Sequence, residues 1–167
     1  MAELKNQPCY TKDGEFLGWF SRSVAAMVIV VAMDSNKKWH VLGSERGSGA
    51  ADYQGFWNMP CGYVDFNETV KQAACRECFE ETGVKLDPDK MTLFGYNDKP
   101  TENRQNITFR FMATIPNKTI DQLTFSKENN EKDEVGEIAW IPFDSYKEKK
   151  WAFGHDKIIA EVIKMLS

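Results

Sequence analysis

The chain has 167 residues, the usual size of one domain, and its 42% hydrophobic and 28% charged content is typical of a soluble globular protein. Its net charge of −4 argues against a protein that binds nucleic acid through a basic surface. An acidic protein that binds a polyphosphate needs metal ions to bridge the two, so the charge indicates a metal-dependent mechanism.

The N-terminal residues carry no apolar run of the kind found in a signal peptide. The most apolar stretch, residues 24–33, is about half the length that a membrane span needs. We therefore expect a cytoplasmic protein without a membrane partner, in which the four cysteines are reduced thiols. Residues 1–167 are expected to form a single domain because no linker or internal repeat divides them, and no pattern indicates an oligomeric state.

The first half of the chain predicts a hairpin, two strands and a helix. Asp13-Gly14 is a candidate hairpin turn, and the continuous apolar run 24–33 predicts a central buried strand. After a turn at 34–36, residues 38–44 predict the next strand, and 47–55 a loop of small residues. Residues 67–83 predict a helix with Asn67 as N-cap and Gly83 as C-terminal stop.

The second half alternates strands with polar loops. Strands are expected near 91–96, 107–115 and 138–143, with a polar loop containing Pro100 between the first two. The last helix, 156–166, has apolar residues at helical spacing. Mixed strands with two unequal helices predict an α/β/α sandwich with a mixed central sheet.

Three carboxylates stand close together in the first helix. Glu77, Glu80 and Glu81 are spaced i, i+3 and i+4, so they share one helical face. Such a cluster is commonly a solvated charged face. It also lowers helix stability through repulsion, and a hard cation such as Mg²⁺ would neutralise it.

The residues around this cluster resemble the signature of the Nudix hydrolase family. The match runs from Gly62 through Glu68 to Arg76-Glu77, then to Glu80-Glu81, Gly83 and Val84. It is tight over residues 62–84 and loose over most of the chain. The resemblance implies a Nudix-type α/β/α fold and a loop–helix–loop that binds Mg²⁺ or Mn²⁺ at a diphosphate.

Residue roles follow from the resemblance position by position. The family's metal ligands correspond to Glu77, Glu80, Glu81 and the backbone carbonyl of Cys61. The pair of residues that orients these ligands corresponds to Arg76 and Glu68. The family often supplies a further glutamate, as ligand or general base, from the loop before a late strand. Glu134 fits that placement best and Glu137 second, although a solvated acidic loop is an equal alternative. Arg46 matches a position that contacts substrate phosphates.

Two positions depart from the family pattern. Cys61 stands where glycine is usual, and Cys78 where an aliphatic residue is usual. A carbonyl ligand does not depend on its side chain, and cysteine packs as a small hydrophobe, so both changes should leave the site and core intact. The Cys75-x-x-Cys78 spacing lacks the partners of a zinc site, so we expect both thiols to be buried against the sheet. Trp57, Phe79 and Trp140 are likewise interpreted as core aromatics.

The implied reaction is attack of water on a nucleoside diphosphate linked to another group. Glu77, Glu81 and Glu134 remain alternative general bases. ADP-ribose is indicated by Pro100, by the ending Ala152-Phe153-Gly154-His155, and by Arg104 in a loop that can bind a second sugar. A pyrophosphohydrolase of damaged nucleoside triphosphates and a non-catalytic ligand-sensing Nudix domain are the alternatives.

Overall fold

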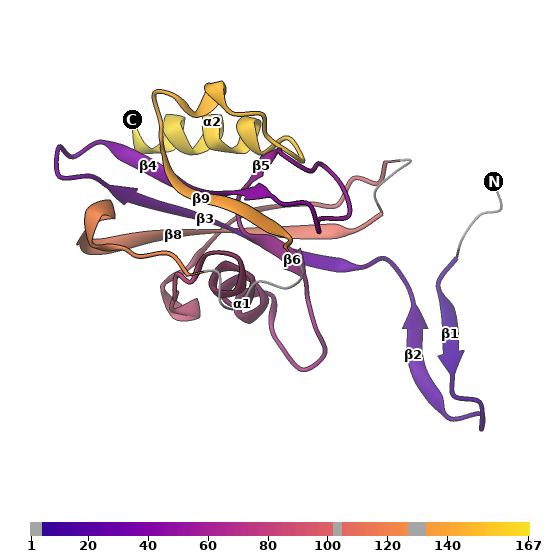
Figure 1. Cartoon of the computed structure of the whole chain (residues 1–167). Coiled ribbons are helices and arrows are strands. Elements are labelled where there is room, and N and C mark those ends of the chain that lie inside the picture. The colour runs from indigo at the N-terminus through magenta and orange to yellow at the C-terminus, as the bar shows by residue number, and fades with distance from the viewer. Residues whose placement is uncertain (1–4, 102–104, 127–132) are drawn as a thin grey trace.

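The computed structural model describes residues 5–101, 105–126 and 133–167, with the backbone alone at 116–118. A mixed sheet lies between two helices, α1 (Val70–Thr82) on one face and α2 (His155–Leu166) on the other (Figure 1). The main path through the sheet is β5-β4-β3-β8-β7, with β6 paired to β3 and β9 to β4. Among the described strand pairs of this sheet, β3 and β8 alone run parallel. The predicted α/β/α sandwich is confirmed.

The bounds of the strands define this sheet. They are β3 (Val24–Met33), β4 (Trp39–Arg46), β5 (Trp57–Asn58), β6 (Cys61–Tyr63), β7 (Thr92–Asn97), β8 (Ile107–Thr119) and β9 (Val135–Pro142). Short 3-10 turns occur at Pro88–Lys90, Ile120–Gln122 and Tyr146–Glu148. None of the described helices is long and apolar enough to cross a membrane.

Strand β3 is apolar throughout because it is buried on both faces. Side chains alternate along a strand, so Val28 and Val30 pack towards α1, while Ile29 and Val31 pack towards α2. Strand β3 therefore forms the centre of two hydrophobic cores, one on each face of the sheet. The predicted bounds of this strand are confirmed.

Helix α1 begins two residues later than predicted. Thr69, not Asn67, is the N-cap: its side chain accepts the Gln72 amide, and the Gln72 side chain accepts the Thr69 amide. This reciprocal pair is a capping box, for which the sequence carried the Thr-x-x-Gln signal. Asn67 lies before the helix with a φ of 66°. The predicted stop at Gly83 is confirmed, since its left-handed backbone (φ 76°) closes the last turn.

Strands β4 and β9 extend further towards the site than predicted. Strand β4 continues to Arg46, so this residue lies within the strand and not after it, and β9 begins at Val135 instead of residue 138. The two extensions pair with each other, Arg46 opposite Val135. Backbone hydrogen bonds to a neighbouring strand thus override the polar character of these strand ends.

The N-terminal hairpin forms a separate two-stranded sheet. Strand β1 (Gln7–Tyr10) pairs with β2 (Phe16–Phe20), and the Gly14 amide donates to the Thr11 carbonyl in the turn. This confirms the turn predicted at Asp13-Gly14. The hairpin extends away from the main sheet and its helices (Figure 1).

The two cysteines of the Cys75-x-x-Cys78 pair occupy different environments. Cys78 is fully buried between α1 and the sheet, whereas Cys75 is only half-buried beside Met91. The expectation of burial against the sheet is therefore confirmed for Cys78 alone. Of the three aromatics, Trp57 is buried and Trp140 packs against the core, but Phe79 is only half-buried, beneath the Lys85 ammonium.

Cys78→Ala should lower the free energy of unfolding by about 1 kcal/mol, because it leaves a cavity in the core. Cys75→Ala should lower the free energy of unfolding by clearly less, since part of the Cys75 side chain is already solvated. Urea denaturation of both variants measures the difference. Equal losses would show that the two thiols do not differ in burial as described.

Candidate active site

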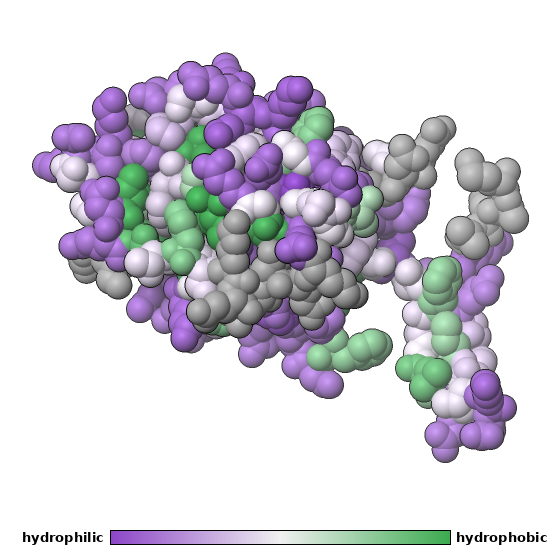
Figure 2. Space-filling model, in the orientation of Figure 1, coloured by the Kyte–Doolittle hydropathy of each residue, from purple (hydrophilic) through white to green (hydrophobic). Residues whose placement is uncertain are grey.

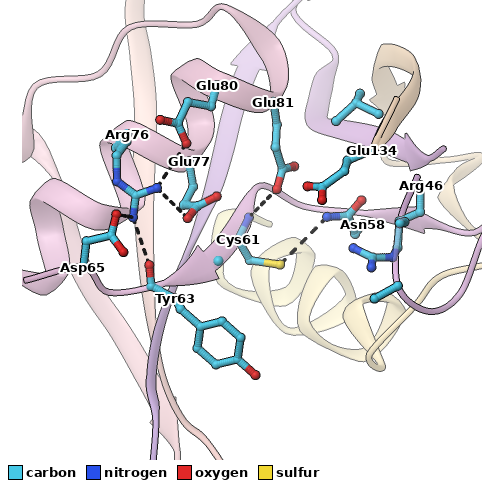
Figure 3. A pocket seen from close by; sticks show the side chains of 14 residues that line it. Arg46, Asn58, Cys61, Tyr63, Asp65, Arg76, Glu77, Glu80, Glu81 and Glu134 are labelled. Atoms are coloured by element: carbon cyan, nitrogen blue, oxygen red, sulfur yellow. Dashed lines mark hydrogen bonds and ion pairs between the residues drawn. The ribbon is translucent and has the colours of Figure 1, made fainter. Parts of the chain in front are cut away.

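A cavity of about 500 Å³ opens where α1 faces β6 and the ends of β4 and β9. The side chains of Glu77, Glu80, Glu81 and Glu134 point into it, together with those of Arg46 and Arg76 (Figure 3). The structure thus brings the predicted glutamates of the helix and the predicted glutamate of the distant loop into one space.

Arg76 is the centre of the charge network on α1. Its guanidinium binds Glu68 with two hydrogen bonds, of 2.7 and 3.1 Å. It also donates to Glu77 at 2.7 Å, to Glu80 at 3.0 Å and to the carbonyl of Tyr63 at 2.9 Å. Hydrogen bonding to Arg76 lowers the pKa of Glu68. The guanidinium therefore offsets the repulsion expected between the helical carboxylates.

The carboxylate of Glu77 lies directly over Gly62. A Cβ at position 62 would overlap the Glu77 carboxylate, so any other residue there would push this carboxylate away from its place beside Arg76. Burial raises the pKa of Glu77, against the opposing effect of Arg76. This contact gives the glycine of the sequence signature a physical reason.

Gly62→Ala should therefore displace the Glu77 side chain or the β6 backbone. Because the overlapping atoms are the end of a flexible side chain, the free energy of unfolding should fall by no more than about 1 kcal/mol, but we expect catalytic activity to fall because the Glu77 carboxylate is moved. Gly136→Ala on β9 is a control for substitution at glycine as such, because its backbone is not left-handed and the nearest atom that a Cβ there meets is the end of the Glu45 side chain, at 3.2 Å. Normal activity of Gly62→Ala would contradict the close approach.

Glu81 is held from the opposite side of the cavity. Its carboxylate accepts hydrogen bonds from the Cys61 amide at 3.3 Å and from the Ser44 hydroxyl at 3.1 Å. Burial raises the pKa of Glu81 to about 8, with repulsion from Glu77 adding to the shift. A carboxyl group with this pKa is poised either to exchange a proton near neutral pH or to bind a cation.

Sequence reasoning missed two residues of this site. Ser44 and Asn58 are buried polar side chains, and the Ser44 hydroxyl lies 3.2 Å from the Asn58 side-chain oxygen. Isolated polar residues in strands give no periodic signal. Their polar character within otherwise apolar strand segments was the one feature that could have indicated them.

Glu134 lies at the start of β9, on a loop fixed by backbone contacts. The Gly47 amide donates to the Glu134 carbonyl at 2.7 Å, and the Gly49 amide to the Asp133 carbonyl at 3.0 Å. A Cβ at Gly47 would overlap the Asp133 carbonyl, so the two loops are in close contact. Glu137 lies exposed on β9 and is not among the residues that line the cavity. Geometry therefore favours Glu134 of the two candidates.

Arg46 separates the acidic cavity from a second groove. Its guanidinium donates to the Asp52 carboxylate at 2.7 Å and lies 5.0 Å from the centre of the Phe153 ring. The groove has a volume of about 360 Å³ and shares Arg46, Ala51, Cys61, Gly62 and Tyr63 with the cavity. Its other walls include Asn106, Thr108, Phe153 and His155. The predicted contact residue Arg104 lies outside the described residues.

The donor set fits a hard divalent cation. Glu77, Glu80 and Glu81 offer carboxylate oxygens, which Mg²⁺ and Mn²⁺ prefer. Within the described ranges, no three acidic, thiol or imidazole side chains converge closely enough to hold a metal ion. Arg76 explains this, because it binds the Glu77 and Glu80 carboxylates itself. Burial raises the pKa of Glu77 and of Glu81, so a bound cation would stabilise the charged forms of both carboxyls.

The fold and the cavity together define a class of α/β/α proteins that carry a carboxylate-rich helix beside a mixed sheet. Comparison with known proteins identifies the family. The family model for the NUDIX domain matches residues 22–162, so the chain belongs to the Nudix family.

Individual relatives agree with this assignment. Nudix hydrolase 2 of Arabidopsis thaliana is 26% identical over 111 residues, which cover 66% of this chain and 37% of that protein. The chain spans between 23% and 52% of the length of the first curated relatives it matches.

Two solved structures show the same fold. The NUDIX domain of Shewanella oneidensis NrtR, crystallised with ADP ribose, superimposes with a TM-score of 0.70 at 17% identity and covers 89% of this chain and 90% of that chain. The second structure is a bifunctional NMN adenylyltransferase/ADP ribose pyrophosphatase of Francisella tularensis, complexed with AMP and a manganese ion. It superimposes with a TM-score of 0.65 at 22% identity, and the match covers 89% of this chain and 43% of that chain.

Proposed function

We propose that the chain is a Nudix pyrophosphohydrolase, which cleaves the phosphoric anhydride bond of a nucleoside diphosphate linked to another group. The observation that carries this proposal is the convergence of Glu77, Glu80 and Glu81 with Glu134 in one cavity. A domain that only senses a ligand has no need for a full set of metal-binding carboxylates.

The cofactor in this proposal is Mg²⁺ or Mn²⁺. Glu77, Glu80, Glu81 and the Cys61 carbonyl would hold it, as the family pattern implies. When bound, such an ion neutralises the diphosphate and lowers the pKa of bound water. Arg76 and Glu68 act as positioning residues, because their hydrogen bonds fix the orientation of the Glu77 and Glu80 carboxylates.

The general base is assigned to Glu134. It lies across the cavity from α1, and unlike Glu77 it is not hydrogen bonded to Arg76, so it is available to accept a proton from water. Arg46 stands beside it at the entrance to the second groove, where a guanidinium suits a phosphate oxygen.

The second groove supports a substrate with a substantial group on each side of the diphosphate. Tyr63 and Phe153 offer ring surfaces, and Asn106 and Thr108 offer hydrogen bonds suited to ribose hydroxyls. The NrtR domain complexed with ADP ribose shares this fold. With the Pro100 position and the Ala152–His155 ending, these features favour ADP-ribose over a nucleoside triphosphate.

A substrate panel tests the proposal. The pure protein with Mg²⁺ is incubated with ADP-ribose, NADH, diadenosine polyphosphates, and common and oxidised nucleoside triphosphates. Phosphate is measured after phosphatase treatment for the first three, and after inorganic pyrophosphatase treatment for the triphosphates, which a phosphatase would attack directly. We expect kcat/KM for ADP-ribose to exceed that for any triphosphate by at least about tenfold, or ~1.4 kcal/mol of transition-state preference. A triphosphate that leads by the same factor would replace the substrate assignment. No turnover of any compound would refute the enzyme assignment.

Metal dependence is tested with the same assay. A chelator should abolish turnover, and Mg²⁺ or Mn²⁺ should restore it, because the proposed ligands are hard oxygen donors. Elemental analysis should find no stoichiometric zinc. A tightly held zinc ion in every chain would instead assign a metal role to the cysteines.

A further inference from the structure

Arg110 on β8 carries a positive charge that is partly removed from water. Hydrophilic residues cover much of the face of the molecule shown in Figure 2, and water solvates the charges there. The Arg110 side chain, by contrast, is half-buried, and its Nε atom is buried without a hydrogen-bond partner. Buried polar groups in proteins almost always have a partner, so this guanidinium requires an explanation.

The other arginines that the structure describes all have partners. Arg22 donates to three backbone carbonyls, whereas Arg46 and Arg76 bind carboxylates. Arg110 forms no ion pair with any carboxylate of the described residues. Partial burial of a guanidinium that lacks a counter-charge destabilises the folded protein. The position is therefore suited to an anion that arrives with a ligand.

The strand pairing places Arg110 next to two residues of the second groove. Met27 on β3 is its partner in the β3–β8 register, and Thr108 precedes it by two residues on β8. Both of these residues line the groove. Side chains alternate along a strand, so Thr108, Arg110 and Met112 share one face of the sheet, and Met112 packs into the core on the α2 side. Arg110 therefore lies on the groove face, roughly 7 Å along the strand from Thr108.

The strand on the other side of Arg110 leaves space beside it. Gly95 on β7 is its partner in the β7–β8 register, and a Cβ at Gly95 would meet no atom within 4 Å. The residues assigned above to ribose hydroxyls, Asn106 and Thr108, belong to the same segment as Arg110 and line the groove. A phosphate carried by such a hydroxyl would lie within reach of the long arginine side chain.

We infer that Arg110 binds a phosphomonoester on a ribose of the substrate, outside the diphosphate that is cleaved. This inference rests on the proposed function, and it narrows the substrate class to nucleoside diphosphate compounds that carry a third phosphate. Arginine binds phosphate through charge-assisted and often bidentate hydrogen bonds. A site whose buried polar group would otherwise stay unpaired discriminates against the analogue that lacks the matching group, here a ribose with a free hydroxyl.

Substrate pairs that differ by a single phosphate test this inference. NADPH and NADH differ at a ribose 2′ position, and coenzyme A and dephospho-coenzyme A at a ribose 3′ position. In at least one pair, we expect kcat/KM of the wild type with Mg²⁺ to be about tenfold or more higher for the phosphorylated member, the usual effect of one hydrogen bond to a charged group. Products are separated by anion-exchange chromatography, because a coupled phosphatase would attack the third phosphate itself.

Variants at Arg110 assign this preference to its charge. Arg110→Met keeps the length of the apolar stem and should remove the preference, whereas Arg110→Lys keeps the charge and should retain part of it. Lys164→Met is the matched control, because it removes an exposed positive charge in the last turn of α2; it should keep the full preference.

Thermal denaturation in chelator gives a measurement that does not depend on turnover. The phosphorylated member of the preferred pair should raise the Tm of the wild type more than its partner does, and this difference should disappear in Arg110→Met. Without a ligand, Arg110→Met should be at least as stable as the wild type, because it removes a charge that lacks a partner.

The possible outcomes separate this inference from the proposed function. Equal hydrolysis within both pairs would overturn the inference and leave the proposed function intact. A preference that persists in Arg110→Met, or one that is lost in Arg110→Lys or in Lys164→Met, would overturn it as well, as would equal rises in Tm within both pairs. No hydrolysis of any compound would refute the proposed function, and this inference with it.

Discussion

Replacing Glu81 by glutamine is expected to lower kcat by about a hundredfold or more, because several kcal/mol of transition-state stabilisation depend on the metal. Glutamine keeps the volume, and its single side-chain oxygen can still accept the Cys61 amide, while its NH2 group can donate to the Ser44 hydroxyl oxygen. The fold should therefore survive, and Glu80→Gln should lose activity in the same direction. Steady-state assays with Mg²⁺ measure the loss, and near-wild-type rates in both variants would refute the ligand assignment.

The same substitution should stabilise the metal-free protein. Burial raises the pKa of Glu81 to about 8 from an ordinary 4.5. Between these pH values the folded state binds the proton more tightly than the unfolded state does, so stability falls as pH rises through this window. Glu81→Gln removes this loss and should raise the free energy of unfolding near neutral pH by about 1 kcal/mol. Thermal denaturation from pH 4 to pH 9 in chelator would show it, as the slope with pH should become shallower in the variant.

Glu134→Gln is expected to lower kcat by about 10²-fold, the usual effect of losing a general base. Because Glu134 is not a proposed metal ligand, the Mg²⁺ concentration for half-maximal activity should change little. Glu137→Gln is the matched control: it alters an exposed carboxylate three residues away on β9, outside the cavity.

The comparison of these two variants decides the assignment of the base. Full activity in Glu134→Gln would transfer the role to Glu77 or Glu81. A loss confined to Glu137→Gln would show that the loop adopts a different position during catalysis.

Much of the fold could be predicted from hydrophobic patterning. The bounds of β3 were correct because a strand buried on both faces is apolar at every position. The N-cap was wrong because Asn67 is a good capping residue in isolation, and the Thr69–Gln72 reciprocal pair was overlooked. The ends of β4 and β9 were misplaced because they are held by each other, and pairing between segments some 90 residues apart leaves little trace in either one.

The part of the site that lies within one segment of the sequence could be predicted. The spacing of Glu68, Arg76 and the helical glutamates can be seen in the sequence itself. Ser44 and Asn58 were not predicted, because Ser44 contacts Glu81, and Asn58 contacts Ser44, only in the folded chain. The apolar hairpin presents the same difficulty, since its sequence predicts a turn but not its position away from the body.

The backbone contacts of Asp133 and Glu134 affect the entropic cost of each catalytic cycle. Surface loops normally sample many conformations, and ordering one in the transition state lowers the rate through entropy. Here the Gly47 and Gly49 amides hold residues 133 and 134 against the end of β4. The conformational freedom of residues 133 and 134 is thus lost once, during folding, and turnover does not have to remove it again. Arg46 pairs with Val135 across the two strands, so its position relative to Glu134 is also set during folding.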